Sequence, residues 1–398
     1  MAYDVVRRLP RDLYVVAGAR AFSILGNAVA VTALMLDFHD RGTGTWAVAG
    51  LLAAGAVPIV VLAPLVGSLV DLFDSRQLIV VSSLWQGAAC LALAFVGQPL
   101  VVLLLVALNA CGTAVTNPLF LALIGAMVPD GDLAPANSVQ QGAVTIATMA
   151  GPPIGGLLTG LTGGAQVPLL LDALVFVLVA GTGLLIGTRR RPSSSAPTAR
   201  AGITMLFTDR VLAAGVALAV LLPLVVHLIY VAQVYLVRDT FGASGLAFGL
   251  LQTTHMMGLL IGTAVASRFN TVRRIVMGTP VSAAVMSVAI VLIGLLGSLS
   301  AAFVLYVVAG VCMSVVSVSV ATLLLLRTPD SAIGRVMASF TAVHRAAGLV
   351  AYGLGAMVVG LLPPETVYVL AGTGALIIVA SLVPASRRAW ALTRLDVN

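Results

Sequence analysis

Acidic and histidine side chains inside apolar runs are the residues of this chain most suited to chemistry. Asp37 and Asp172 lie near the ends of two such runs, and His227 and His255 lie near the middles of two others. An ionisable group at membrane depth is costly and usually serves the movement of an ion or substrate, and histidine exchanges its proton near physiological pH. We therefore predict that these four residues carry proton coupling. A neutral packing role for each histidine, and an interfacial anchoring role for Asp172, remain open.

Polar and aromatic side chains within the apolar runs form a second set, which is suited to line a binding cavity. We predict as cavity residues Arg20, Asn27, Asn109, Asn117, Tyr230, Gln233 and Gln252. Arg20 has an alternative role, because a long arginine side chain can extend to the membrane surface from within a span.

Enzymatic chemistry has no support in the sequence. The chain contains no glycine-rich P-loop, which an ATP-driven pump would carry, and no cluster of histidine, cysteine and acidic residues with the spacing of a metal site. Cys90, Cys111 and Cys312 lie in apolar runs and are interpreted as small buried apolar residues. We predict no catalytic residue, no metal and no cofactor.

The elements that position these residues follow from composition. The 398 residues are 60% hydrophobic and only 9% charged, whereas roughly a quarter of a soluble domain is charged. A membrane-spanning helix needs about 20 apolar residues, and by that rule the chain has about twelve spans. They are predicted at 12–36, 46–70, 77–97, 99–126, 135–160, 166–188, 210–237, 244–267, 274–297, 299–326, 334–360 and 366–386. The sequence predicts an all-α membrane protein embedded in the lipid bilayer.

The arginines give the expected orientation. The net charge of +7 is spread among short loops, as orientation signals are, which argues against a nucleic-acid partner. Arginines concentrate at both termini and in alternate connections, so we predict a multi-pass protein of the inner or plasma membrane with both termini in the cytoplasm.

The chain divides into two related halves. An arginine-, proline- and serine-rich stretch predicts a cytoplasmic linker at 189–209, between six-helix bundles at 1–188 and 210–398. Pro129-Asp130 and Pro329-Asp330 stand at the same place in each half (329 − 129 = 200). Two such parallel repeats are what a rocking two-bundle transporter requires.

A charged turn follows the second predicted span, with the pattern Gly67-x-Leu-x-Asp71-x-x-Asp74-x-Arg76. Gly67 allows close helix approach, Asp71 can offset the positive end of a neighbouring helix, and Arg76 can pair with Asp130 or Asp132. An ordinary charged turn is the alternative. The pattern resembles motif A of the major facilitator superfamily, a cytoplasmic gate, and with Phe73 it is most similar to the drug:proton antiporter-3 branch of macrolide and siderophore exporters. Leu72 and Ser75 stand where that branch often has basic residues, which implies fewer ion pairs.

The fifth predicted span contains a glycine- and proline-rich run, Gly151-Pro152-Pro-x-Gly155-Gly156. Proline removes a backbone hydrogen bond, and the glycines form a flat face for a partner helix. Generic helix packing is the alternative. The run resembles antiporter motif C of the same superfamily, which implies export. In the first span, the run Arg20-x-x-Ser23-x-x-Gly26-Asn27 resembles the first span of this branch, although an acid commonly follows the glycine there.

These patterns together predict the major facilitator fold, with twelve helices in two pseudo-symmetric bundles. The function that we predict is export of a small amphipathic or apolar compound by alternating access, driven by protons and carried out by a monomer. A uniporter or importer on the same fold is one alternative, and a non-transporting membrane sensor is another.

Overall fold

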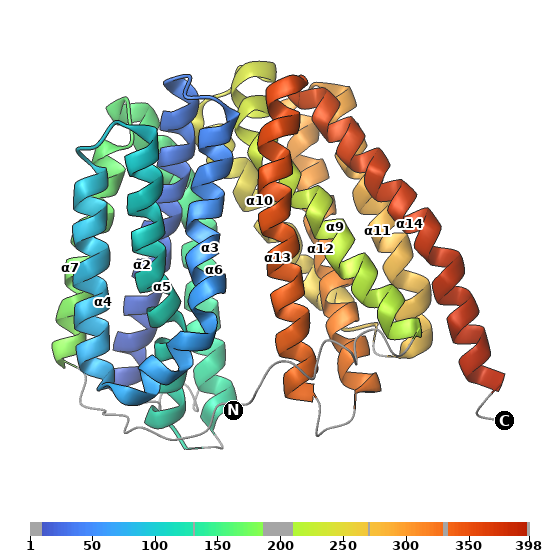
Figure 1. The fold of residues 1–398 in the computed structure, drawn as a ribbon, viewed down its shortest axis with the longest axis horizontal. Coiled ribbons are helices and arrows are strands. Elements are labelled where there is room, and N and C mark those ends of the chain that lie inside the picture. Colours follow the sequence, from blue (N-terminus) through green and yellow to red (C-terminus); the bar gives the residue numbers. More distant parts are fainter. Residues whose placement is uncertain (1–9, 130–131, 186–209, 270, 329–332, 396–398) are drawn as a thin grey trace. The chain divides into compact units, whose positions relative to one another are not determined.

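The computed structural model describes residues 10–129, 132–185, 210–269, 271–328 and 333–395. Within these residues, 12 helices are long and apolar enough to cross a membrane (Figure 1). Because a bilayer offers backbone groups no hydrogen-bond partner, a spanning segment must satisfy them internally, as a helix does. The prediction of twelve spanning helices is confirmed.

The helices fall into two compact units. The N-terminal unit comprises residues 1–196 and Ser244–Gly249, and the C-terminal unit comprises residues 197–243 and 250–398. The predicted linker at 189–209 lies outside the described residues.

The N-terminal unit contains the first six helices, drawn blue to green in Figure 1. They are α2 (Arg11–Asp40), α3 (Thr45–Leu72), α4 (Ser75–Leu93), α5 (Pro99–Met127), α6 (Leu133–Thr162) and α7 (Gln166–Leu185). Helix α2 packs against α6 and α7, α4 packs against α7 and α5, and α3 packs against α5.

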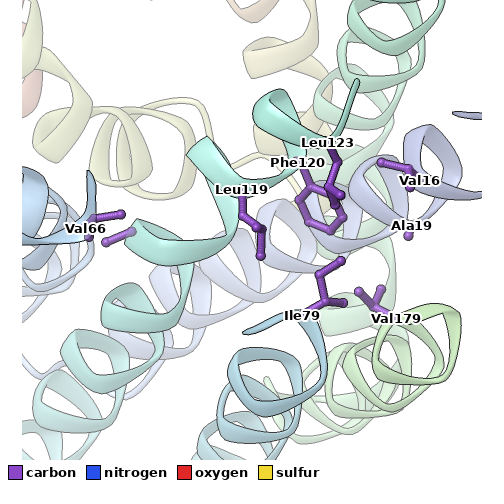
Figure 2. Packing of buried hydrophobic residues seen from close by; sticks show 9 residues of the cluster. Val16, Ala19, Val66, Ile79, Leu119, Phe120, Leu123 and Val179 are labelled. Atoms are coloured by element: carbon purple, nitrogen blue, oxygen red, sulfur yellow. The ribbon is translucent and has the colours of Figure 1, made fainter. Parts of the chain in front are cut away.

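An apolar cluster joins five of these helices. Its buried members come from α2, α3, α4, α5 and α7 (Figure 2): Val16, Ala19, Val66, Ile79, Ala114, Leu119, Phe120, Leu123 and Val179. Close packing of such a cluster restricts how each helix can rotate about its axis. It therefore fixes which side chains the same five helices turn toward one another farther along the unit.

The C-terminal unit contains the other six spanning helices. They are α9 (Arg210–Tyr235), α10 (Gly245–Ala266), α11 (Val272–Leu296), α12 (Leu299–Arg327), α13 (Ile333–Leu361) and α14 (Pro364–Leu395), with the first turn of α10 grouped with the other unit. Helix α9 continues into a π-helical turn, Leu236–Thr240. Gly258 and Gly262 on α10 let its backbone approach Val307 and Val311 of α12.

Candidate functional site

A chain of polar side chains crosses the N-terminal unit from α5 through α4 to α7. The Asn109 Nδ2 group donates to Cys90 Sγ at 2.9 Å, and the Cys90 thiol donates to Asp172 Oδ2 at 3.3 Å. Cys90 is 1% exposed and Asp172 is 2% exposed. Removing such groups from water is costly unless hydrogen bonds replace the lost hydration. These hydrogen-bonded side chains thus hold the Asp172 carboxyl group at a defined position within the unit.

A second pair of hydrogen bonds extends this polar chain along α4 and α5. The Thr113 hydroxyl donates to Gln86 Oε1 at 3.1 Å, and Gln86 Nε2 donates to the Ser82 carbonyl at 3.1 Å. Gln86 reaches α5 because Gly112 leaves room for it: a Cβ atom at position 112 would lie 2.5 Å from Gln86 Cγ. The face shared by α4 and α5 is therefore polar in the middle of an apolar unit.

Gly26 on α2 makes room for the other carboxylate oxygen. A Cβ atom at position 26 would overlap Asp172 Oδ1. This oxygen is buried and has no hydrogen-bond partner among the described residues. Asp172 is therefore held between a thiol donor on α4 and the bare backbone of α2.

The Asp172 side chain lines a cavity of about 120 Å³ inside the N-terminal unit. Five helices contribute to the lining, and its polar members are Asn27, Cys90, Asn109, Thr113 and Asp172. Asn27 is exposed, whereas Asp172 is buried. The cavity therefore joins an accessible amide to a buried acid, and the remaining lining is aliphatic.

The two predicted membrane acids have different environments. Asp37 Oδ2 forms an ion pair with Arg41 Nε at 2.9 Å, and Arg41 follows one turn later at the end of α2. No ion pair to Asp172 is found among the described residues, and its hydrogen-bond partner is a neutral thiol. A buried carboxylate without a cation is expensive. The two acids therefore differ in charge compensation: Asp37 has a cationic partner, and Asp172 has none among the described residues.

The predicted gate residues are described in part. Asp74 caps the N-terminus of α4, where its side chain accepts from the Arg76 backbone N–H at 2.8 Å. The Arg76 Nε atom is buried and has no hydrogen-bond partner in the described part of the chain. Gly67 and Asp71 lie on α3, but the Asp71 side chain and the whole of Asp130 lie outside the described residues. The expected pairing of Arg76 with Asp130 or Asp132 stays a prediction.

The motif C-like residues lie where α6 packs against α2. The backbone of α6 at Gly151 lies against Ala28, and at Gly155 it lies against Val29 and Thr32. Gly156 lies against the backbone of Gly245 in the same unit, and α6 remains one continuous helix through Pro152. Close helix contact is thus one role that these small residues have.

The two histidines belong to an aromatic cluster in the C-terminal unit. The ring of His227 lies 5.6 Å from that of Tyr230, and the ring of His255 lies 6.1 Å from that of Tyr306, measured between centroids. The Tyr306 and Tyr368 hydroxyl groups are 2.5 Å apart, and Gln233 of the same unit is 1% exposed. The four predicted coupling residues are divided between the units: Asp37 and Asp172 lie in the N-terminal unit, and His227 and His255 lie in the C-terminal unit.

The remaining predicted cavity residues are partly buried. Asn117 does not line the Asp172 cavity, and Gln252 is half-buried on α10. Arg20 lies about two helical turns before Asn27 on α2, and its Nε and Nη1 atoms are buried without a hydrogen-bond partner among the described residues.

Sequence reasoning missed three members of the polar chain. Gln86 and Thr113 are polar residues within apolar runs, and the same signal identifies Asn109, which is among the predicted cavity residues. Cys90 was interpreted as an apolar residue, and that interpretation is incomplete, because its thiol bonds to both Asn109 and Asp172. All three cysteines are free thiols, and no group of three or more metal-ligating side chains occurs in the described residues.

Within the described residues, the chain has twelve helices long and apolar enough to cross a membrane, and its N-terminal unit contains a cavity lined by a buried acid. The chain belongs to the Major Facilitator Superfamily, whose family model matches residues 13–352. It is therefore a multi-pass membrane protein of that fold, as the sequence patterns predict.

Similar proteins include transporters of several kinds. The lysophospholipid transporter LplT of Yersinia enterocolitica (serotype O:8 / biotype 1B) is 24% identical over a 322-residue alignment, which covers 76% of this chain and 76% of that protein. The structure of the nucleoside transporter NupG has a TM-score of 0.76 at 12% identity and covers 94% of this chain and 99% of its own. A bacterial homolog of the human lysosomal transporter Spinster, in an inward-facing and occupied conformation, has a TM-score of 0.74 at 15% identity, with 96% of each chain covered. At these sequence identities, the similarity to the two solved structures shows a common fold alone.

Proposed function

We propose that this transporter exports a small amphipathic or apolar compound by alternating access, with proton antiport driving the cycle. The observation that carries the proposal is the Asp172 carboxyl group: it is buried, lines a cavity and has no cationic partner in the described part of the chain. Taking up a proton removes the cost of its charge, and losing the proton restores that cost. A group of this kind couples a proton to two states of one structure.

Export as the direction of transport rests on sequence patterns. The Gly151–Gly156 run resembles motif C of antiporters, and the Gly67–Arg76 pattern is most similar to the drug:proton antiporter-3 branch. The arginine distribution supports an inner or plasma membrane location with both termini in the cytoplasm. His227, His255 and Asp37 remain further candidates for the proton path, and a monomer suffices because one chain contains both units.

Inverted membrane vesicles test the coupling. A fluorescent amphiphilic dye should accumulate in vesicles that contain the transporter when an inwardly acidic proton gradient is imposed, and an uncoupler should abolish the accumulation. Asp172→Asn should retain dye movement down its own gradient but lose the response to protons. Asp40→Asn is the matched control, because Asp40 is exposed at the end of α2. Dye accumulation that is independent of the proton gradient would reject antiport.

A second candidate substrate is a lysophospholipid. The similarity to a protein named lysophospholipid transporter favours it, and such a lipid is itself amphipathic. A fluorescent lysophosphatidylethanolamine in the same vesicles distinguishes the two substrate classes. Lipid movement without dye movement would identify the lipid as the substrate, and movement into the cytoplasmic side would identify an importer.

A further inference from the structure

The hydrogen bonds around Asp172 leave the polar lining of its cavity rich in acceptors. The S–H group of Cys90 and the O–H group of Thr113 are the one donor that each side chain has, and both are used inside the cluster, on Asp172 and Gln86. Asn109 uses an N–H group on Cys90. What remains is acceptor capacity on Asp172 Oδ2, on the Asn109 side-chain carbonyl oxygen and on the Thr113 hydroxyl, together with the second N–H group of Asn109.

The charge of the cavity points the same way. Asp172 is its only charged lining residue, and no ion pair to it is found in the described part of the chain. A buried carboxylate is stabilised either by a proton or by a cation that brings hydrogen-bond donors. The site therefore complements a ligand group that is positive and carries N–H groups.

The size and the walls of the cavity limit the rest of the ligand. About 120 Å³ is available, well above the roughly 10–15 Å³ that a cavity needs to hold one water molecule, so an ammonium group and a short stem fit. Leu34, Leu51, Leu52 and Val106 line the cavity and suit an aliphatic stem. Asn27 is exposed and lines the same cavity, so a ligand can reach Asp172 from the Asn27 side.

We propose that the N-terminal unit binds the protonated amine of an amphipathic substrate at Asp172, Asn109 and Thr113, inside the cavity that opens at Asn27. The inference rests on the proposed transport function and specifies its substrate class as primary or secondary amines. Substrate and proton then alternate as the positive partner of one carboxyl group.

Three probes that share a hexyl chain separate the contributions of charge and hydrogen bonding. Hexylamine is a cation with N–H donors, hexyltrimethylammonium is a cation without them, and hexanol is neutral. Binding to the purified transporter in detergent is measured by calorimetry with no proton gradient. Hexylamine should bind about tenfold or more tightly than either other probe, the loss expected for a missing charge-assisted hydrogen bond.

Variants locate the site. Asp172→Asn should reduce hexylamine affinity about tenfold or more and leave hexanol unchanged, while Asp40→Asn should bind all three probes like the parent. The selectivity of the unmutated protein needs no variant, so misfolding of Asp172→Asn cannot hide the answer. Equal affinity for the three probes, no binding of any of them, or unchanged amine affinity in a folded Asp172→Asn protein would overturn the proposal. These outcomes leave proton-driven export standing, whereas amine-selective binding without proton-dependent flux would reject the export function instead.

Discussion

The carboxylate of Asp172 on α7 occupies the space that a side chain at position 26 of α2 would fill. A Cβ atom built at Gly26 would overlap Asp172 Oδ1. The two helices therefore meet through a glycine in the first span and an acid in the sixth span. The absence of a side chain at position 26 is a condition for the buried position of the acid.

We expect Gly26→Ala to displace the Asp172 carboxyl group. Overpacking at a closely packed position costs about 1–3 kcal/mol, so the variant should unfold at a lower temperature in detergent and lose proton-driven transport. Gly18→Ala on the same helix is the matched control, because no atom outside the neighbouring residues and the local helix backbone lies within 4 Å of a Cβ atom there. It should be neutral, or stabilised by up to about 1 kcal/mol through helix propensity. If both variants have the same unfolding temperature, the close contact between Gly26 and Asp172 is not required.

Cys90 should act through hydrogen bonding instead of through its size. Cys90→Ser keeps a donor and an acceptor, whereas Cys90→Ala leaves Asp172 Oδ2 and Asn109 Nδ2 unpaired, at about 1–3 kcal/mol for each buried group. We expect the alanine variant to unfold at a lower temperature and to shift the pH at half-maximal transport, and the serine variant to keep the parent profile. Identical pH profiles for the alanine and serine variants would contradict a positioning role.

The layout of helices was accessible from the sequence because apolar run length and glycine or proline breaks encode it directly. The span predicted at 99–126 is α5, Pro99–Met127. The span predicted from residue 77 begins earlier, at Ser75, because Asp74 caps it. That correction could have been read from the sequence, since aspartate before a helical run is a common N-cap.

The hydrogen-bonded series of polar side chains could not be predicted from the sequence, because it depends on which faces of the helices pack against one another. Cys90 and Asp172 are 82 residues apart and meet only after α4 and α7 have packed. No local pattern marks a thiol as a donor to a distant acid. The Asp37–Arg41 ion pair is the opposite case, because oppositely charged residues four positions apart on a helix are neighbours.

Asp74 should contribute to stability as a helix cap. Its side chain accepts from the Arg76 backbone N–H at 2.8 Å, and replacement of such a cap by alanine costs about 0.5–2 kcal/mol. We expect Asp74→Ala to lower the unfolding temperature. Asp74→Ser, which retains a capping oxygen, should lower it less. If alanine and serine are equally stable, a role for Asp74 in capping would be ruled out, and any transport defect would have to come from its charge.

The hydroxyl groups of Tyr306 and Tyr368 should stabilise the C-terminal unit as a pair. They lie 2.5 Å apart, and the two side chains are 7% and 0% exposed. Tyr368→Phe leaves the Tyr306 hydroxyl without this partner and should cost about 1–3 kcal/mol, whereas removal of both hydroxyls costs less than the sum of the single changes. Unfolding of Tyr306→Phe, Tyr368→Phe and the double variant measures the coupling. Additive losses would mean that the two hydroxyls act independently.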